Sequence, residues 1–432
     1  MTRASTLAVA AVLLVQGAAA AQSPGDDLAV VTLQQARERA LSIAPQGVSA
    51  RGQTATAAWE RRAAYSSLFT PNIIAASSYT SFSDPFFNFG TGDISSTATS
   101  ATLQASYTVL GGGKLSEVKR SRASFESAVA SETAAEFRVA LAIDGAYYGV
   151  LANRELARVA DDRLRRAQEQ LDVARVRVLS GAAIATDSLQ LLLEVNRARL
   201  ALLQRDSALL VSRLKLGNGI GLSGPAEAAP VDTVAPPPLP FTQEQAVAEL
   251  RTRGPELEAV RAAERSASAS LGSEREAYLP EITVGATMGA YDAEFFPSAL
   301  NRSQFVVNVS LPIWNGGQRE LAVARARAER NVARAEREQR ERAAAEVMTA
   351  AYNGHETARA AIELAQIGVA AASENYRVQR ARYREGSTTI LDLLEAQVAL
   401  SEAEAVLVQS RYAARLALAQ IEALLGRRVL TP

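Results

Sequence analysis

Two carboxylates in the second half of the chain, Asp392 and Glu395, lie three residues apart within a helical pattern. At that spacing both side chains project from one face of a helix, where they attract cations and repel each other. No nucleophile lies nearby, and the single His of the chain, His355, belongs to a different helical stretch beside Glu356. We therefore expect an electrostatic role for this pair rather than acid–base catalysis.

The composition excludes several other kinds of chemistry. The chain has no Cys, which rules out disulfides, thiolate catalysis and zinc–thiolate sites. Lys+Arg and Asp+Glu both total 46, so no bulk positive field recruits nucleic acid. The glycine run 111–113 before Lys114 lacks the spacing of a phosphate-binding loop. We expect no enzymatic activity, no cofactor, no metal site and no nucleic-acid partner.

The segments that position the carboxylates occur twice in the chain. The two copies share an opening motif, a proline, a tyrosine, a glycine and an aspartate: Thr32–Ala36 matches Thr242–Ala246, Pro45 matches Pro255, Tyr147 matches Tyr352, Gly181 matches Gly386, and Asp187 matches Asp392. Duplication on this scale is typical of a barrel, a tube or another pseudo-symmetric assembly.

Most of the chain has the pattern of long helices. No Pro interrupts Lys114 to Leu179, and a helix of that length would reach roughly 100 Å at 1.5 Å per residue. Apolar stripes rich in Ala recur at alternating steps of three and four on both sides of Gly181 and Gly386. They predict two antiparallel helical hairpins, about 114–217 and about 317–426. An ordinary coiled-coil bundle would explain the stripes equally well.

Four stretches, about 72–83, 97–110, 282–290 and 304–313, break the helical pattern. None contains Asp, Glu, Lys or Arg, and apolar and polar residues alternate in them. Alternation predicts strands, and strands of this length span a bilayer when tilted, where a charge on the lipid face would cost about 2–4 kcal/mol. Soluble hairpins covering a core are the alternative. Because four strands cannot close a membrane barrel and open edges cannot face lipid, we expect the chain to oligomerise.

The N-terminus has the pattern of a secretion signal, and the rest divides into two repeats. Residues 1–21 combine a basic Arg3, an apolar run and a small-residue cleavage site. We expect a first repeat at 22–217, a Pro-rich linker at 218–240 and a second repeat at 241–432. Each repeat would contain a helix, a strand pair and a long helical hairpin. The predicted fold class is mainly α with a transmembrane β-barrel portion.

This order of elements resembles the TolC-type outer-membrane efflux protein family. Four motifs carry the resemblance: Thr32-Leu33-x-x-Ala36, Leu68-x-x-Pro71-x-Ile73, Leu311-Pro312-Ile313-Trp314-Asn315-Gly316-Gly317, and Tyr383-x-x-Gly386-x-x-x-Ile390-x-Asp392-x-Leu394. The resemblance implies a homotrimer in which each copy gives four strands to a twelve-stranded barrel, continued by an α-helical tunnel through the periplasm.

In this family the tunnel closes where the helices coil inward at the periplasmic tips. The residues that match this constriction are Asp187 and Thr186 in the first repeat, and Tyr383, Thr388, Asp392 and Glu395 in the second. The resemblance implies a latch hydrogen bond between Tyr383 and Asp187. Thr388 departs from the pattern, because the family's best-known latch has an Arg there.

Three copies would turn Asp392 and Glu395 into two stacked acidic rings. Crowding of like charges in such rings attracts cations and raises carboxylate pKa values. Capping of the helices that follow Gly181 and Gly386 is the alternative role of Asp187 and Asp392, and the two roles are compatible.

The resemblance implies a passive exit channel of a tripartite efflux system, located in the outer membrane and extending into the periplasm. A periplasmic adaptor (membrane fusion) protein would dock near Gly181 and Gly386 and open the tip, an inner-membrane transporter would supply energy through the adaptor, and outer-membrane lipid would surround the barrel. Type I protein secretion through the same scaffold is one alternative. A soluble periplasmic coiled-coil adaptor or structural rod is another, from a different class.

Overall fold

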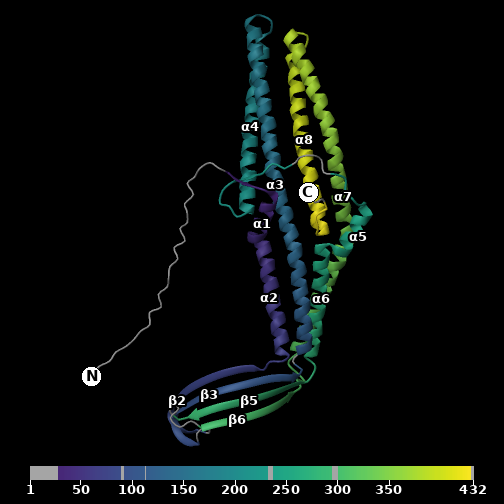
Figure 1. Ribbon diagram of the computed structural model, residues 1–432. Coiled ribbons are helices and arrows are strands. Elements are labelled where there is room, and N and C mark those ends of the chain that lie inside the picture. The colour runs from purple at the N-terminus through teal and green to yellow at the C-terminus, as the bar shows by residue number, and fades with distance from the viewer. Residues whose placement is uncertain (1–27, 89–91, 112, 232–236, 294–299, 430–432) are drawn as a thin grey trace, which may run out of the picture.

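The computed structural model describes residues 28–88, 92–111, 113–231, 237–293 and 300–429. The expected signal peptide, 1–21, lies outside these residues. A sheet occupies one end of the elongated molecule and two helical hairpins extend to the other end (Figure 1). In this part of the chain no helix combines the length and the hydrophobicity needed to cross a bilayer.

Each repeat begins with two helices where one was expected. They are α1 (Leu33–Ile43) and α2 (Pro45–Ser67) in the first repeat, and α5 (Gln243–Arg253) and α6 (Pro255–Glu276) in the second. The division has a local cause: Pro45 and Pro255 start α2 and α6, and the residue before a proline is driven out of the helical region. Thr32 and Thr242 start α1 and α5 with matching capping boxes.

Four strands form one antiparallel sheet. They are β2 (Asn72–Asn88), β3 (Asp93–Leu110), β5 (Glu281–Asp292) and β6 (Leu300–Ser310). The order is β2-β3-β5-β6, so the central pair β3–β5 joins the two repeats, with Ala101 beside Ala290 and Ala105 beside Ala286. β2 and β6 are therefore the two edges of the sheet.

The strands differ in length from the uncharged stretches 72–83, 97–110, 282–290 and 304–313. β2 and β3 continue past the first two stretches, beyond a register shift between Ser81 and Phe86, because backbone pairing does not require uncharged side chains. β5 is also slightly longer, and β6 begins earlier, at Leu300. β6 ends at Ser310 because Pro312 has no backbone N–H to give to a ladder.

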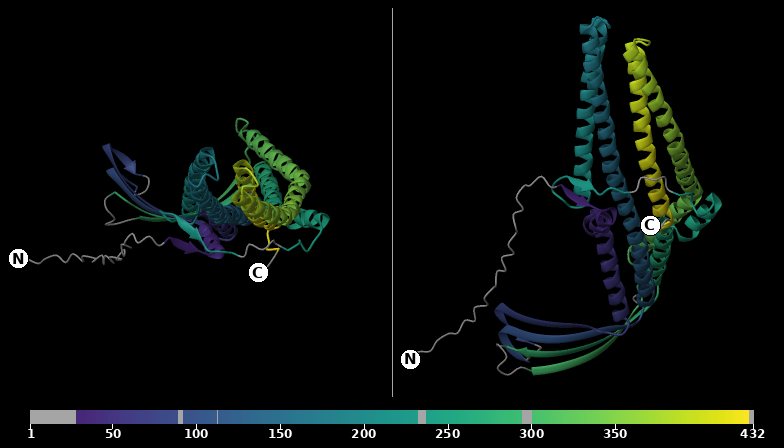
Figure 2. Two further views of the ribbon diagram at one scale, coloured as in Figure 1. Left: turned by 90° about the horizontal axis from the view of Figure 1, so that it is seen from above. Right: turned by 45° about the horizontal axis from the view of Figure 1, so that its top comes forward.

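The long helices α3 (Lys114–Leu179) and α7 (Gln318–Glu385) have 66 and 68 residues, which gives each roughly 100 Å. Their hairpin partners α4 (Ala185–Gly219) and α8 (Ile390–Leu425) have 35 and 36 residues. Each long helix consequently pairs with its hairpin partner only in the half far from the sheet. In the half near the sheet, α3 packs against α2 and α6, and α7 packs against α6 (Figures 1 and 2).

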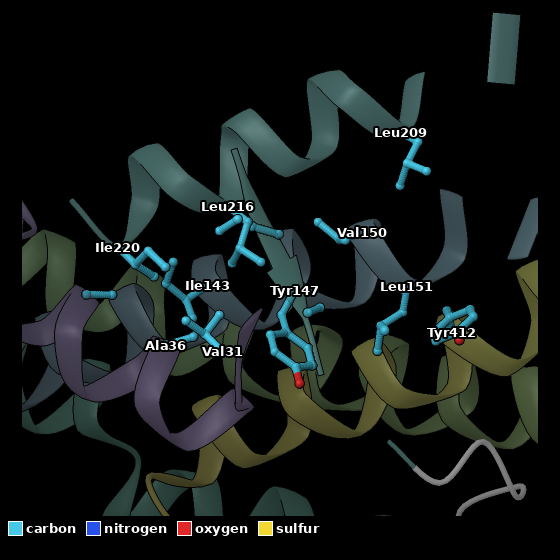
Figure 3. Close-up of a cluster of buried hydrophobic side chains, with 14 of the residues drawn as sticks. Val31, Ala36, Ile143, Tyr147, Val150, Leu151, Leu209, Leu216, Ile220 and Tyr412 are labelled. Atoms are coloured by element: carbon cyan, nitrogen blue, oxygen red, sulfur yellow. The ribbon is translucent and has the colours of Figure 1, made fainter. Parts of the chain in front are cut away.

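The largest buried cluster lies midway along the molecule, where α1 and two short strands pack on α3 and α4. Tyr147, Leu216 and Ile220 are at its centre (Figure 3), and the hydroxyl of Tyr147 donates to the carbonyl of Ala229 at 2.7 Å. The short strands β1 (Ala29–Val31) and β4 (Ala226–Ala228) pair in parallel. The segment expected as a linker, 218–240, thus contains the end of α4 and a strand.

Candidate functional site

The tips of the two helical hairpins lie at the end of the molecule opposite the sheet (Figure 1). Gly181 and Gly386 end α3 and α7 in the left-handed region, with φ of 73° and 78°. A Cβ on Gly181 would meet no atom within 4 Å, so backbone conformation rather than space favours glycine there. At Gly386 a Cβ would also come within 3.3 Å of the Arg177 guanidinium.

Tyr383 and Asp187 meet between the hairpins. Tyr383 lies in the last turn of α7 and is 4% exposed. Its hydroxyl donates a long hydrogen bond of 3.4 Å to Oδ2 of Asp187, in the first turn of α4. Burial, together with the nearby Asp187 carboxylate, raises the pKa of the Tyr383 phenol, which therefore stays protonated and able to donate at neutral pH.

Asp187 is not the N-cap of its helix. That position belongs to Ile184, whose side chain makes no capping hydrogen bond. Asp187 is the third residue of α4, where its negative charge still interacts favourably with the helix N-terminus. Its carboxylate thus both supports α4 and accepts from the opposite hairpin.

Arg177 is a tip residue that the sequence analysis missed. It lies in the last turn of α3 and donates to the carbonyl oxygen of Tyr383 and, at 3.1 Å, to that of Ala182. Its guanidinium carbon is also 4.9 Å from the centroid of the Tyr383 ring. Arg177 therefore joins the turn of its own hairpin to the end of α7. A basic residue in the last turn before Gly181 was the available signal.

Asp392 has the capping role that was the alternative to a pore ring. Its Oδ2 accepts from the Thr389 hydroxyl at 2.6 Å, the Thr389 N–H at 3.0 Å and the Thr388 hydroxyl at 2.9 Å. The Thr389 hydroxyl in turn accepts from the Asp392 N–H, which completes a capping box at the start of α8. These hydrogen bonds lower the pKa of Asp392 within a single chain, and the bond from the Thr389 hydroxyl has the largest effect. This direction is opposite to the rise in pKa that was expected for carboxylates crowded into rings by three copies.

The remaining predicted site residues have different environments. Thr388 has an uncharged side chain, and its hydroxyl is 3.2 Å from Oε1 of Gln379 and 2.9 Å from Oδ2 of Asp392. Glu395 and Thr186 are both exposed, one turn into α8 and at the start of α4. The chain therefore brings Tyr383 and Asp187 together and leaves Glu395 and Thr186 open to solvent.

Further polar contacts join the hairpins below the tips. Arg166 on α3 pairs with Glu404 on α8 at 2.9 Å, and Gln170 donates to the Tyr376 hydroxyl at 2.6 Å. Leu171 and Leu393 belong to an apolar cluster in the same region. Polar pairs and an apolar cluster therefore both connect the two hairpins near the tips.

Comparison with known proteins identifies relatives of the chain. The sequence profile described as outer membrane efflux protein matches residues 32–222 and 246–427. The chain is 28% identical over 350 residues to the pyoverdine export outer membrane protein OpmQ of Pseudomonas putida, covering 76% of this chain and 69% of that protein. It is 24% identical over 279 residues to the toluene efflux pump outer membrane protein TtgC of Pseudomonas putida, covering 62% of this chain and 56% of that protein.

Solved structures share the fold over most of the chain. CusC superposes with a TM-score of 0.75 at 17% identity, covering 95% of this chain and 96% of that one. VceC of Vibrio cholerae superposes with a TM-score of 0.75 at 19% identity, covering 91% of this chain and 96% of that one. The outer membrane channel MtrE of Neisseria gonorrhoeae was solved in an open state. It superposes with a TM-score of 0.76 at 19% identity, covering 92% of this chain and 89% of that one.

Proposed function

Because the chain belongs to the outer membrane efflux protein family, whose profile matches both repeats, we propose that three copies of it form the passive exit duct of a tripartite efflux system. The chain is an outer-membrane efflux protein that extends into the periplasm, and its family and fold are those of passive channels. The observation that carries the proposal is one continuous unit in which a four-stranded sheet leads directly into helices of roughly 100 Å.

The edges of the sheet support closure by several copies, and the number three comes from the family resemblance. Within the described residues β2 pairs only with β3 and β6 only with β5, so each edge strand has one free side. Such an edge cannot face lipid, because its backbone N–H and C=O groups would be unsatisfied. Pairing β6 of one copy with β2 of the next satisfies both edges, and three copies give a barrel of twelve strands, well above the minimum of about eight.

The paired tips support a gate at the periplasmic end. The contacts of Tyr383 with Asp187 and Arg177 hold the two hairpins of one copy together. Around a threefold axis, Asp392 and Glu395 of each copy form acidic rings at the narrow end of the tunnel. Thr186 and Thr388 flank the same constriction. Breaking the tip contacts lets the hairpins move apart and widens the pore.

The partners are those that the family resemblance implies. A periplasmic adaptor protein docks at the hairpin ends beside Gly181 and Gly386, and its binding favours the open arrangement. The duct binds no nucleotide and catalyses no reaction, so an inner-membrane transporter supplies the energy through the adaptor. The names of OpmQ and TtgC describe export of pyoverdine and toluene, which favours small organic cargo over secreted proteins.

Conductance across a planar bilayer tests the proposal. Purified wild-type chain in detergent is expected to migrate as a heat-sensitive trimer and to insert as a channel with a low, stable conductance. A chain that is a detergent-free monomer in the soluble fraction would instead be the coiled-coil rod, and the duct would be rejected.

A further inference from the structure

A cationic recess lies between α2 and α3 at the ends of these helices nearest the sheet. It is lined by Arg61, Arg62 and Tyr65 from α2 and by Arg122, Phe125 and Glu126 from α3, and we call it the α2–α3 recess. With three arginines and one glutamate, its lining carries a net positive charge. None of the contacts at the hairpin tips involves it.

Aromatic rings hold two of its arginines without neutralising them. The guanidinium carbon of Arg61 lies 3.9 Å from the ring centroid of Phe125, and that of Arg62 lies 4.8 Å from the ring centroid of Trp59. In the described part of the chain neither arginine forms an ion pair, whereas Arg122 pairs with Glu126 at 3.0 Å. Arg61 and Arg62 are thus oriented side chains whose charge remains available to an anion.

The recess is at the height of the membrane surface. Arg62 lies five residues before Ser67, the last residue of α2, or about 7 Å along the helix axis. Phe69, between α2 and β2, is 81% exposed, and Trp314, after β6, is 74% exposed. Exposed aromatic side chains are expected at the periplasmic border of the hydrocarbon core of the membrane. A headgroup layer is about 5–7 Å thick on each side of the hydrocarbon core. Arginine side chains can extend across the small distance between this position on α2 and the headgroup layer.

We place the recess on the outer face of the proposed tunnel. The buried residues Ala57 and Ala64 mark the face of α2 that packs on α3. At 100° per residue, Arg62 and Tyr65 both lie to the same side of this face. Glu126 of the recess lies 18 residues, or five full turns, before Asp144 on α3, and Asp144 contacts Arg37 of α1, so the recess and α1 lie on the same face of α3. Because α1 covers this face of α3 as an additional layer, we place the face on the outside of the tube, where the circumference is larger.

A second recess on the opposite flank has a different lining. It is lined by Ser, Thr, Gly, Gln and Ala residues and by Glu60, and its lining contains no arginine. This lining suits a water-filled lumen. The two flanks of one helix pair therefore differ in charge, with the cationic flank turned outward.

We propose that the α2–α3 recess binds the phosphate of an anionic phospholipid, such as phosphatidylglycerol, in the periplasmic leaflet of the outer membrane. This inference rests on the outer-membrane placement of the proposed duct. Arg61 and Arg62 contact the phosphate, and Tyr65, about one turn nearer the sheet, lies beside the glycerol region. Three copies place three such anchors around the base of the barrel, fixing its depth in the bilayer.

Lipid retention measures this binding directly. Trimers are reconstituted in mixed phosphatidylcholine and phosphatidylglycerol, re-extracted in detergent, and the retained lipids are counted by mass spectrometry. Near a membrane surface each arginine favours an anionic lipid by about 5-fold. Arg61→Gln with Arg62→Gln should therefore lower the retained phosphatidylglycerol-to-phosphatidylcholine ratio by about 25-fold. Arg61→Lys with Arg62→Lys should restore most of it.

Arg205→Gln is the matched control, because Arg205 is an exposed arginine on α4, far from the sheet. It should retain lipid as the wild type does. The inference is overturned if the glutamine double variant keeps the wild-type ratio while all preparations conduct normally, and the arginines then only cover Phe125 and Trp59. Failure of the duct itself is distinguishable, because the wild type would then give no conductance.

Discussion

The hydroxyl of Tyr383 on α7 lies 3.4 Å from Oδ2 of Asp187 on α4, so one hydrogen bond connects the ends of the two helical hairpins. Arg177 on α3 strengthens the same junction through the Tyr383 carbonyl and ring. The two repeats are thus joined at both ends, by β3–β5 pairing in the sheet and by this junction at the tips.

Removing the phenol hydroxyl should loosen the tip. Tyr383→Phe keeps the ring but loses the donor, and a hydrogen bond of this kind contributes about 0.5–1.5 kcal/mol. We expect the open fraction in bilayer recordings to rise about 2- to 10-fold. Tyr352→Phe is the control, because its hydroxyl donates to Phe241 midway along α7, away from the tips. Equal open fractions in both variants would argue against the latch.

Arg177 should act together with Tyr383. Arg177→Gln removes the guanidinium that contacts both the Tyr383 carbonyl and its ring, so it should also raise the open fraction. Because the two residues share one junction, the double variant should open less than the sum of the single effects predicts. Arg175→Gln, which alters an exposed arginine paired with Asp172 on the same helix, should leave gating unchanged. Strict additivity would place Arg177 outside the latch.

The acidic residues at the tip should govern cation block. Asp392→Ala with Glu395→Ala is expected to weaken block of the channel by multivalent cations, because it removes both rings of charge. Single-channel recordings with increasing cation concentration measure this effect. Glu402→Gln, farther along α8, serves as the control. Block that is unchanged in the double alanine variant would reject the assignment of the rings.

The cap at the start of α8 should be sensitive to acid. Hydrogen bonds from Thr389 and Thr388 hold the pKa of Asp392 below its ordinary value of 3.8. A carboxylate with a lowered folded-state pKa stabilises above the ordinary value, and this contribution is lost as pH falls through the lower one. Hydrogen exchange of peptides covering 387–396 should accelerate, relative to intrinsic rates, only in that acidic range. The Asp392→Ala variant should lack this step. A midpoint above 3.8 would mean that ring repulsion outweighs the cap.

The buried ion pair of the first repeat should dominate local stability. Asp144, 2% exposed, accepts two hydrogen bonds from the Arg37 guanidinium. Asp144→Asn leaves a buried cation without its counter-charge and should cost about 3–5 kcal/mol in the free energy of unfolding. Asp172→Asn, at an exposed pair on the same helix, should cost below about 1 kcal/mol. Chemical denaturation in detergent provides the comparison.

The second repeat offers a direct test of that cost. Val247 and Thr349 stand at the positions that match Arg37 and Asp144. Arg37→Val with Asp144→Thr should therefore recover much of the stability lost in Asp144→Asn, because neither charge of the pair remains buried. A double variant as unstable as the single one would show that the site needs the ion pair itself.

Sequence patterns anticipated the elements with strong periodicity. The uncharged alternating stretches placed all four strands of the sheet, and the long Ala-rich stripes placed both hairpins. The patterns were less informative where a single residue acts, as at Pro45 and Pro255, which divide each opening helix in two. The three-residue strands β1 and β4 carry no periodic signal, so β4 inside the segment 218–240 and its pairing with β1 were missed.

Contacts between residues far apart in the sequence could not be derived from spacing. Tyr383 and Asp187 were paired only through the family resemblance, since their contact depends on how the two hairpins lie side by side. Arg177 was overlooked for the same reason. Asp392 was expected both as a cap and as a ring residue, and a single chain displays only the cap, because rings require the other copies.

Closure of the sheet between copies is the central claim, and disulfide mapping tests it most directly. The chain has no Cys, so introduced cysteines are the only thiols. Ser77→Cys on β2, combined in turn with Ser303→Cys, Phe305→Cys or Val307→Cys on β6, should give a covalent ring of three chains at one register. Thr102→Cys on the central strand β3, paired with the same β6 positions, should give none. If the β2–β6 pairs yield only monomers under oxidation in membranes, the trimeric duct is contradicted.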